Sequence, residues 1–340
     1  MKPLKRLSTT TKRLSIAIVF VAVLVMPGAL ASSIWIENAS SVFFFGAIPI
    51  AGAVFGGNQP IALRFTFLTA GVGALAFLVV GNTLLSTLLL ATIAGLVGLT
   101  ARRGHQSPGI LMAITLAFMV VSPPVLTWNA SGKQLEGSLF VLVGAGLLLA
   151  GGLWAVAIGY VVRNRIPAGA KPAEMELPVV IPYALALFVA TGIATFGALT
   201  YDISGLGAWI ILTVLLVVQP DQKSMNDKAK NRILGTLAGA VIAVIVLLIL
   251  QSLGDQDGTV QLICAFTLIG IAMSYFQKGP YWKFVMFLTP GVILMDSNQV
   301  SNQILVAEVR VGFTLIGAVI AVLVAVGVRT IASKVNYSGS

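Results

Sequence analysis

Two arginines, Arg64 and Arg232, stand where long apolar runs begin. A guanidinium group can hold a carboxylate through two parallel hydrogen bonds, so an arginine at such a place can draw an organic anion to the inner mouth of a membrane pathway. An arginine there can also extend its alkyl stem along the apolar surface and reach a lipid phosphate. Both arginines are therefore candidate substrate ligands, with lipid contact as the alternative.

Three further ionisable residues lie next to or inside apolar runs. Asp296 ends one run, and Glu308 and Arg310 interrupt another. Ionisable groups at membrane depth are costly, and this cost makes each of them a candidate for function. If export is driven by protons, Glu308 and Asp296 are the carboxylates that we expect to take part in proton coupling, together with Arg310. The alternative is a structural ion pair at the membrane surface.

Prolines and small residues interrupt several of the apolar runs. The interrupted positions are Pro49, Ser122, Pro123, Pro124, Thr289, Pro290 and Gly291. Unwound backbone inside a membrane is tolerated only where it is buried in protein or lines a cavity, so these residues are candidates for lining a translocation pathway. The alternative is that the prolines only kink packed helices.

The composition of the chain is that of a membrane protein. Of its 340 residues, 58% are apolar and 9% are charged, whereas about 25% are charged in an ordinary soluble domain. The alternating pattern of a membrane β-barrel is absent, so helices must be the spanning elements. The net charge of +10 does not indicate nucleic acid binding, because the basic residues lie in short connections between apolar runs. We predict an all-α polytopic membrane protein.

Twelve apolar runs follow one another with short connections between them. We expect transmembrane helices at residues 14–32, 40–57, 62–80, 83–100, 108–127, 138–162, 178–199, 204–219, 233–252, 259–276, 282–296 and 304–328. With the amino terminus inside, all 21 lysines and arginines except Lys133 and Arg310 fall on the inner side, as cytoplasmic loops require. This pattern indicates a multi-pass protein of the inner (plasma) membrane with both termini in the cytoplasm. Ala29-Leu30-Ala31 imitates a signal-peptide cleavage site, but the apolar run is longer than a usual signal core, so we expect it to remain as the first span.

An internal repeat divides the chain into halves. The matching positions are Gln59-Pro60 with Gln219-Pro220, Arg64 with Arg232, and Ser122-Pro123 with Thr289-Pro290. Each half has six spans, an even number, so the copies run in the same direction as two parallel six-helix repeats. The expected organisation is a tail at 1–13, a first repeat at 14–163, a linker at 164–177, a second repeat at 178–332 and a tail at 333–340. The eighth and eleventh spans are the shortest, which favours a pathway between the halves.

One stretch of the second half carries a longer motif. It reads W-x-x-L-T-V, then Q-P, then R-x-x-G-T-x-x-G, at Trp209, Leu212, Thr213, Val214, Gln219, Pro220, Arg232, Gly235, Thr236 and Gly239. The final apolar run reads R-x-x-x-T-x-x-G-A at Arg310, Thr314, Gly317 and Ala318. These patterns resemble the fusaric-acid-resistance type of transporter, which includes aromatic acid exporters. The resemblance covers residues 180–332 and is faint over the first half, which lacks the Gly-Thr-x-x-Gly sequence.

The resemblance implies efflux of small organic, often aromatic, acids, in some cases with a periplasmic adaptor protein. We count Trp209 of the motif among the candidate substrate contacts. The expected function is a secondary transporter that exports organic anions by rocking one half against the other. A passive anion channel and the membrane subunit of a multi-component efflux pump are the alternatives. The lipid bilayer, the anion, an adaptor and further copies of the chain are the expected partners, and nucleic acid is not.

Sequence motifs of enzymes and cofactor sites are missing. The chain contains no G-x-x-x-x-G-K-[ST] phosphate loop, no H-E-x-x-H and no G-x-S-x-G. His105 stands alone in a basic loop and Cys264 alone in an apolar run, so no Cys-based metal site is expected. A membrane enzyme acting on a lipid would need several clustered polar residues on adjacent spans, and the sequence does not show them. We therefore predict neither an enzyme nor a cofactor.

Overall fold

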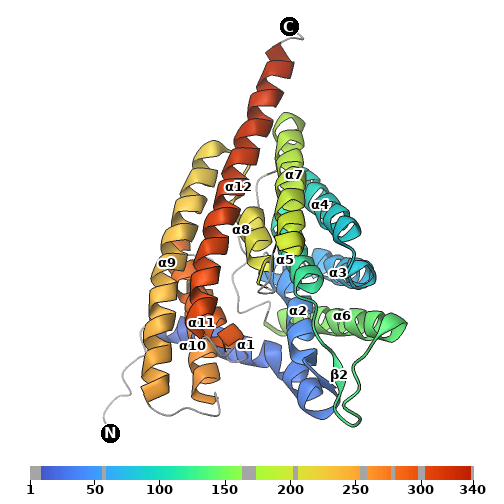
Figure 1. Cartoon of the computed structure of the whole chain (residues 1–340), viewed down its shortest axis with the longest axis vertical. Coiled ribbons are helices and arrows are strands. Elements are labelled where there is room, and N and C mark those ends of the chain that lie inside the picture. Colours follow the sequence, from blue (N-terminus) through green and yellow to red (C-terminus); the bar gives the residue numbers. More distant parts are fainter. Residues whose placement is uncertain are drawn as a thin grey trace. The chain divides into compact units, whose positions relative to one another are not determined.

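The computed structural model describes residues 9–55, 59–162, 174–201, 206–252, 259–276, 280–297 and 303–337. Within these ranges helices dominate (Figure 1). In chain order the elements are α1 (Thr9–Ile34), β1 (Ile36–Glu37), α2 (Ala39–Phe55), α3 (Gln59–Val79), α4 (Thr83–Leu99), the short 3-10 helix η1 (Thr100–Arg103), α5 (Gln106–Val121), β2 (Thr127–Trp128), α6 (Gly137–Val162), α7 (Leu177–Tyr201), α8 (Ala208–Val217), α9 (Gln222–Ser252), α10 (Thr259–Phe276), α11 (Tyr281–Ser297) and α12 (Gln303–Tyr337).

The helices confirm an all-α protein of membrane type. Six helices of the described part are long and apolar enough to cross a membrane: Ile61–Val79, Thr83–Arg103, Gly137–Val161, Leu177–Tyr201, Gln222–Ser252 and Leu305–Ala332. The shorter apolar helices are Ala22–Ile34, Ala39–Ile50, Gln106–Val121, Ala208–Val217, Val260–Ala272 and Tyr281–Met295. A helix therefore coincides with every expected apolar run, while the number of spans stays a prediction.

Helix α5 is shorter than expected. The predicted span 108–127 is wrong at its end, because the helix stops at Val121 and Ser122 takes a non-helical conformation (φ −127°, ψ 65°). Pro123 and Pro124 explain this end, since proline disfavours a helical residue before it and has no N–H to donate. As a result α5 has 16 residues and α11 has 17. Of the two spans expected to be shortest, α8, with ten residues, is the shortest α-helix of the described part, while α11 is one residue longer than α5.

Helix α9 is longer than its apolar run. It begins at Gln222 and adds polar turns before the apolar residues at 233–252. Asp221 caps its start, because the Asp221 Oδ1 accepts a 2.8 Å hydrogen bond from the Ser224 N–H. This bond also holds the pKa of the Asp221 carboxyl below its usual value. The polar loop before the ninth span is thus mostly the first part of a helix.

Packing divides the chain into two compact units. The first unit contains Met1–Val23 and Asp227–Leu315, and the second contains Leu24–Asn226 and Ile316–Ser340. Helices α1, α9 and α12 contribute residues to both units. The two expected repeats at 14–163 and 178–332 stay a prediction.

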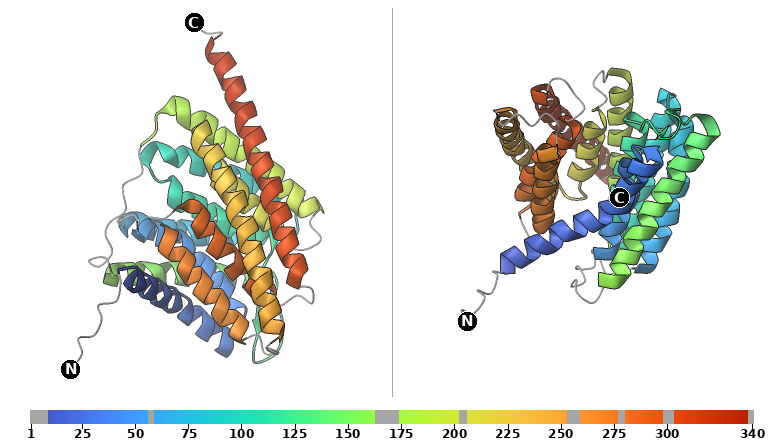
Figure 2. Two further views of the ribbon diagram at one scale, coloured as in Figure 1. Left: turned by 90° about the vertical axis from the view of Figure 1, so that its left-hand side faces the viewer. Right: turned by 90° about the horizontal axis from the view of Figure 1, so that it is seen from below.

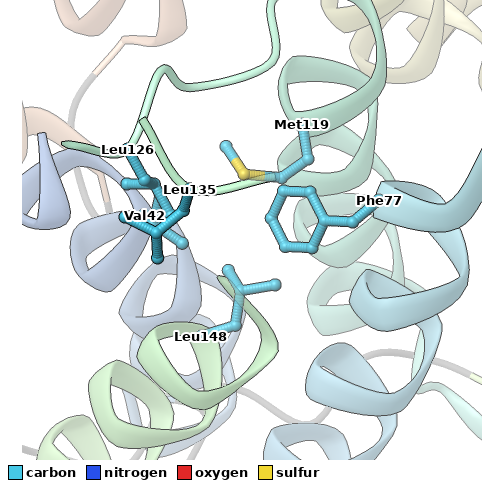
Figure 3. Packing of buried hydrophobic residues seen from close by; sticks show 6 residues of the cluster. All are labelled: Val42, Phe77, Met119, Leu126, Leu135 and Leu148. Atoms are coloured by element: carbon cyan, nitrogen blue, oxygen red, sulfur yellow. The ribbon is translucent and has the colours of Figure 1, made fainter. Parts of the chain in front are cut away.

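In the second unit the helices pack in pairs around a continuous core. Helix α2 lies against α5 and α6, α3 lies against α6, and α4 lies against α7 (Figure 1). One core cluster joins side chains from several of these helices and from the connection between α5 and α6 (Figure 3). Its buried members are Val42, Phe77, Met119, Leu126, Leu135 and Leu148. Such interdigitated side chains hold the helices at fixed positions.

Glycines let α6 approach its neighbours closely. A Cβ on Gly151 would collide with the backbone oxygen of Phe43 in α2, and a Cβ on Gly144 would lie 2.6 Å from the Phe77 ring in α3. Small residues at helix contacts are the usual means of close packing in membranes, where lipid removes the hydrophobic driving force between helices. Gly146, in contrast, faces open space, since a Cβ there meets no atom of the described residues within 4 Å.

Two connections of the second unit pair with each other. Strands β1 and β2 are antiparallel, with Ile36 opposite Trp128 and Glu37 opposite Thr127. Asn38, at φ 64°, turns the chain into α2 and donates a 2.8 Å hydrogen bond from its Nδ2 to the backbone of the connection after α5. The segment between α5 and α6 is therefore ordered by hydrogen bonds as well as by the core cluster.

A proline inside α2 leaves a backbone carbonyl without its helical donor. Pro49 has no N–H, so the oxygen of Phe45, four residues earlier, cannot form its usual helical bond. The Thr115 Oγ1 of α5 donates a 2.9 Å hydrogen bond to this oxygen. Membrane helices tolerate prolines where a neighbouring helix supplies such a replacement. Thr115 therefore ties α5 to the proline of α2.

In the first unit, α10 and α11 run side by side, and Figure 2 shows both in orange. Ala272 of α10 is buried against Phe284 and Val285 of α11. Half-buried rings of Tyr275 and Tyr281 pack around this centre. The helix pair therefore has its own core at the start of α11.

The hydrogen bond from Thr115 to the Phe45 oxygen should stabilise the protein more when Pro49 is present than when it is replaced. Thr115→Val removes the hydroxyl and should lower the free energy of unfolding in detergent by about 1 kcal/mol. In a Pro49→Ala background, the restored N–H serves the Phe45 oxygen, and the same substitution should cost clearly less. Thr115→Ser, which keeps a hydroxyl, is the control. An equal cost of Thr115→Val in both backgrounds would contradict this role.

The packing of α6 predicts opposite results for two of its glycines. Gly151→Ala forces a methyl group onto the α2 backbone and should destabilise the protein by about 1–3 kcal/mol or more. Gly146→Ala should leave stability unchanged or raise it slightly, because alanine favours helix and the site is open. Thermal unfolding followed by circular dichroism measures both variants, and similar stabilities of the two would rule out the α2–α6 contact.

Candidate functional site

The proline of α11 breaks the helical hydrogen bonding at a place that α9 covers. Pro290 has no N–H, so the backbone oxygen of Met286 loses its usual helical donor. A Cβ on Gly239 of α9 would come within 2.8 Å of that oxygen and 2.7 Å of the Thr289 Cβ. Gly235, one turn earlier, lies in the same way against the first turn of α11. The Gly-Thr-x-x-Gly motif thus brings two helix backbones into contact.

Helix α10 lies against the same segment of α11. A Cβ on Gly291 would come within 2.9 Å of the Ala265 oxygen and 2.7 Å of the Ile269 Cγ1. One turn further along, the Nε2 of buried Gln261 donates a 2.7 Å hydrogen bond to the Leu294 oxygen. A side-chain amide therefore serves the backbone of α11 close to its proline.

A buried arginine meets this segment from α12. Arg310 is 4% exposed, and its Nη1 donates a 3.0 Å hydrogen bond to the backbone oxygen of Thr289. Thr289 and Thr314, which follows Arg310 by one turn, are buried as well. A guanidinium group stays charged in proteins. The first unit therefore holds a positive charge beside the proline of α11.

The candidate carboxylates have different surroundings from this arginine. Glu308 is exposed and precedes Arg310 by two residues, and this spacing puts the two side chains on different faces of α12. Asp296 lies in the last turn of α11, and its side chain lies outside the described residues. The proton-coupling role of Glu308, Asp296 and Arg310 stays a prediction.

The two arginines at the starts of apolar runs differ in burial. Arg232 lies well inside α9, is 4% exposed, and donates from its Nη1 to the Tyr281 hydroxyl at 3.4 Å. Arg64 lies in the second turn of α3 and is exposed. Equivalent positions in the expected repeat thus place one guanidinium inside a helix bundle and the other on a helix surface.

Trp209 belongs to a row of aromatic rings in the second unit. It is 8% exposed and meets Phe118 of α5 edge to face, with centroids 4.8 Å apart and planes at 79°. Phe118 stacks on Phe45 of α2 at 5.0 Å and 25°. Phe45 is also the residue whose oxygen Thr115 binds. The tryptophan of the motif therefore anchors α8 beside the proline of α2.

The glutamine-proline motif forms a turn that holds the end of α12. Arg329 donates from Nη1 to the Gln222 Oε1 at 2.8 Å and from Nη2 to the backbone oxygen of Gln219. The Gln219 side chain in turn donates to the last carbonyls of α8, including that of Val218 at 2.7 Å. These bonds connect the ends of α8, α9 and α12 within the second unit.

The remaining candidates divide between the units. In the first unit lie Arg232, Thr289, Pro290, Gly291, Asp296, Glu308 and Arg310, and in the second lie Pro49, Arg64, Ser122, Pro123, Pro124 and Trp209. Four of the first group, Thr289, Pro290, Gly291 and Arg310, come together at one place. Ser122, Pro123 and Pro124 lie in the non-helical segment that ends α5, so the apolar run is interrupted there, and its role in a pathway stays a prediction. The pathway between the halves stays a prediction.

Sequence reasoning missed Thr115 and the bonds of Arg329. A proline shows which carbonyl needs a new donor, but the helix that supplies the donor depends on packing. The sequence around Arg329, at the end of the last span, likewise does not indicate which groups accept its hydrogen bonds. Among the described residues, no three His, Cys, Asp or Glu side chains lie close enough together to hold a metal ion.

Comparison with known proteins gives two matches. The fusaric acid resistance protein-like family matches residues 185–324, the segment that contains Trp209, Gly235, Gly239, Pro290 and Arg310. The chain is also 34% identical over 128 residues to the inner membrane protein YccS of Escherichia coli (strain K12). That match covers 37% of this chain and 17% of the relative. No solved structure matches the chain.

The family match thus falls on the helices that carry the motif and the buried arginine. Together with the apolar helices, it supports a place in the inner membrane, where the relative lies. The protein is a multi-pass, all-α membrane protein whose residues 185–324 are similar to the fusaric acid resistance protein-like family.

Proposed function

We propose that the protein is a secondary transporter that exports small organic anions, with aromatic carboxylates as the leading class, across the inner membrane. The observation that carries this proposal is the buried guanidinium of Arg310 beside the proline of α11. The family match supports the same conclusion, because the matched residues include this arginine and this proline. The substrate itself is part of the proposal.

The physical argument starts from the cost of a charge among apolar helices. An arginine at membrane depth costs about 2.5–3.5 kcal/mol even by insertion measurements, and such residues commonly mark substrate or ion paths. Arg310 presents its donors next to the backbone of Thr289. A guanidinium fork matches the two oxygens of a carboxylate. Arg310 is therefore the residue that we assign to the anion inside the membrane.

The aromatic row of Trp209, Phe118 and Phe45 supports an aromatic substrate in a second way. A substrate ring that replaced one of these ring contacts would regain an attraction of the same kind, about 0.5–1.5 kcal/mol for each pair. The row ends beside Pro49 in α2. We propose that the segments around Pro49 in α2 and Pro290 in α11, two of the four inner prolines of the described helices, each have a part in transport.

Coupling and assembly complete the proposal. Protons drive export through Glu308 or Asp296, and a periplasmic adaptor or further copies of the chain take part in assembly. No enzymatic step and no cofactor belong to this account. The alternatives are a passive anion channel, which would give single-channel currents that need no coupling ion, and a membrane subunit that works only inside a multi-component pump.

The proposed topology has twelve spans in two parallel six-helix repeats, with both termini in the cytoplasm. It predicts that Ser131 faces outwards and that Arg103 and Lys223 face inwards. In a Cys264→Ser background, a membrane-impermeant maleimide added to intact inner-membrane spheroplasts should label Ser131→Cys and leave Arg103→Cys and Lys223→Cys unlabelled until the membrane is opened. Labelling of Arg103→Cys and Ser131→Cys from the same side would contradict the span assigned to α5.

The assignment of Arg310 predicts a loss of transport without a loss of fold. In proteoliposomes with an imposed pH gradient and labelled benzoate as the probe, Arg310→Gln should lower the initial rate at least tenfold, which corresponds to about 1.4 kcal/mol of anion binding. Arg310→Lys should retain part of the activity, because it keeps the charge but loses the fork.

Arg329→Gln is the matched control for Arg310→Gln. Arg329 also lies on α12 and also donates to a backbone oxygen, that of Gln219, but at the end of the helix. Its flux should stay close to that of the unchanged protein. Equal losses for the two variants, or unchanged flux of folded Arg310→Gln, would remove Arg310 from the pathway.

A further inference from the structure

Cations and aromatic rings gather in the first unit at the end of α10, the start of α11 and an inner turn of α9. Arg232 lies where the polar part of α9 gives way to its apolar run, Tyr275 lies in the last turn of α10, and Tyr281, Trp282 and Lys283 form the first turn of α11. This group, which we call the basic-aromatic cluster, is separate from the segment around Pro290 and Arg310.

The lysine of the cluster is held between two rings. The Lys283 Nζ lies 5.8 Å from the centre of the Tyr275 ring and 5.6 Å from the centre of the Trp282 ring, distances at which cation–π attraction acts. The Tyr275 ring is itself stacked on Phe287, with centroids 5.8 Å apart and planes at 9°. Trp282 is 38% exposed. The ammonium group is therefore fixed at a surface that surrounding molecules can reach.

Two further cations lie on α9 near this cluster. Arg232 donates to the Tyr281 hydroxyl, and Lys228 precedes Arg232 by one helical turn, so both lie on one face. The Lys228 side chain is half-buried. Asp227 and Lys230 are exposed, and their spacing from Arg232 turns them towards other faces. The charge on this side of the cluster is positive.

We propose that the basic-aromatic cluster binds the phosphate of an anionic phospholipid in the inner leaflet. Arginine, lysine and a tyrosine hydroxyl together supply donors for several phosphate oxygens. Tyrosine and tryptophan beside helix ends are typical of the depth at which lipid headgroups lie. Basic pockets between transmembrane helices on the cytoplasmic side bind such headgroups. This lipid site goes beyond the proposed transport function, and Arg232 serves it instead of the substrate.

The position of the cluster favours a lipid over a soluble anion. The polar turns of α9 end at Arg232 and the apolar run begins at residue 233, so the cluster lies at the level where headgroups end and acyl chains begin. Leu234 and Leu237 are also exposed, but their spacing from Arg232 turns them, like Asp227 and Lys230, to other faces of α9. The apolar surface of the cluster itself is the Trp282 ring, which is 38% exposed and which acyl chains would cover. A bound lipid would thus satisfy the cations and the apolar surface beside them at once.

The test is native mass spectrometry of the purified full chain, with dioleoyl phosphatidylglycerol as the probe and dioleoyl phosphatidylcholine as the zwitterionic comparison. The unchanged protein should retain phosphatidylglycerol at least tenfold better than phosphatidylcholine. Lys283→Gln should remove most of this preference, and Lys283→Arg should keep it. Lys223→Gln, which changes an exposed lysine at the start of α9, is the matched control and should leave the preference unchanged.

Several outcomes would overturn the lipid site. Equal retention of the two lipids, or an unchanged preference in folded Lys283→Gln, would show that the cluster does not distinguish the anionic headgroup from the zwitterionic one. Displacement of phosphatidylglycerol by an equal concentration of inorganic phosphate would assign the cluster to a free phosphate, and displacement by benzoate would assign it to substrate. The result is independent of transport, because lipid retention is measured without a gradient and benzoate flux is measured in a fixed lipid mixture.

Discussion

A peptide backbone inside hydrocarbon finds no water to bind, so every carbonyl and N–H must be served within the protein. Four described helices contain an inner proline that breaks this rule locally, and two of these prolines, Pro49 in α2 and Pro290 in α11, are candidate site residues. The Phe45 oxygen receives the hydroxyl of Thr115. The segment around Pro290 is covered by Gly239 of α9, and the neighbouring Thr289 oxygen receives the guanidinium of Arg310. A neighbouring hydroxyl thus replaces the hydrogen bond that Pro49 removes, whereas Arg310 binds a carbonyl that Pro290 does not free and places a positive charge beside that proline.

The same constraint explains why charged residues appear where they do. Arg310 can be buried because a backbone oxygen accepts a hydrogen bond from it. An anion bound beside the guanidinium would further offset the free energy lost when water is removed from this charge. Arg329 uses a comparable acceptor at the end of the same helix, where water is near. The proposed anion site therefore needs Arg310 and not Arg329, although both guanidinium groups donate a hydrogen bond to a backbone oxygen.

The apolar runs were enough to predict where the helices lie, because the length of an apolar run and the positions of charges are local properties. The early end of α5 could have been predicted from Pro123 and Pro124, whereas the expectation of a span to residue 127 weighed only hydropathy. The polar start of α9 was visible in Asp221, a good helix cap. Thr115 and the acceptors of Arg329 could not be predicted, since their partners are distant in sequence and depend on how the helices pack.

Packing explains why the motif has these residue types. Gly235 and Gly239 bring α9 onto α11, and Trp209 joins α8 to α5.

The most direct test of the account is an electron cryo-microscopy structure of the chain in lipid nanodiscs with 4-iodobenzoate, whose iodine is easily located. We predict that the carboxylate contacts the Arg310 guanidinium beside the proline of α11. An iodobenzoate bound elsewhere, with Arg310 still held only by protein groups, would contradict the central claim.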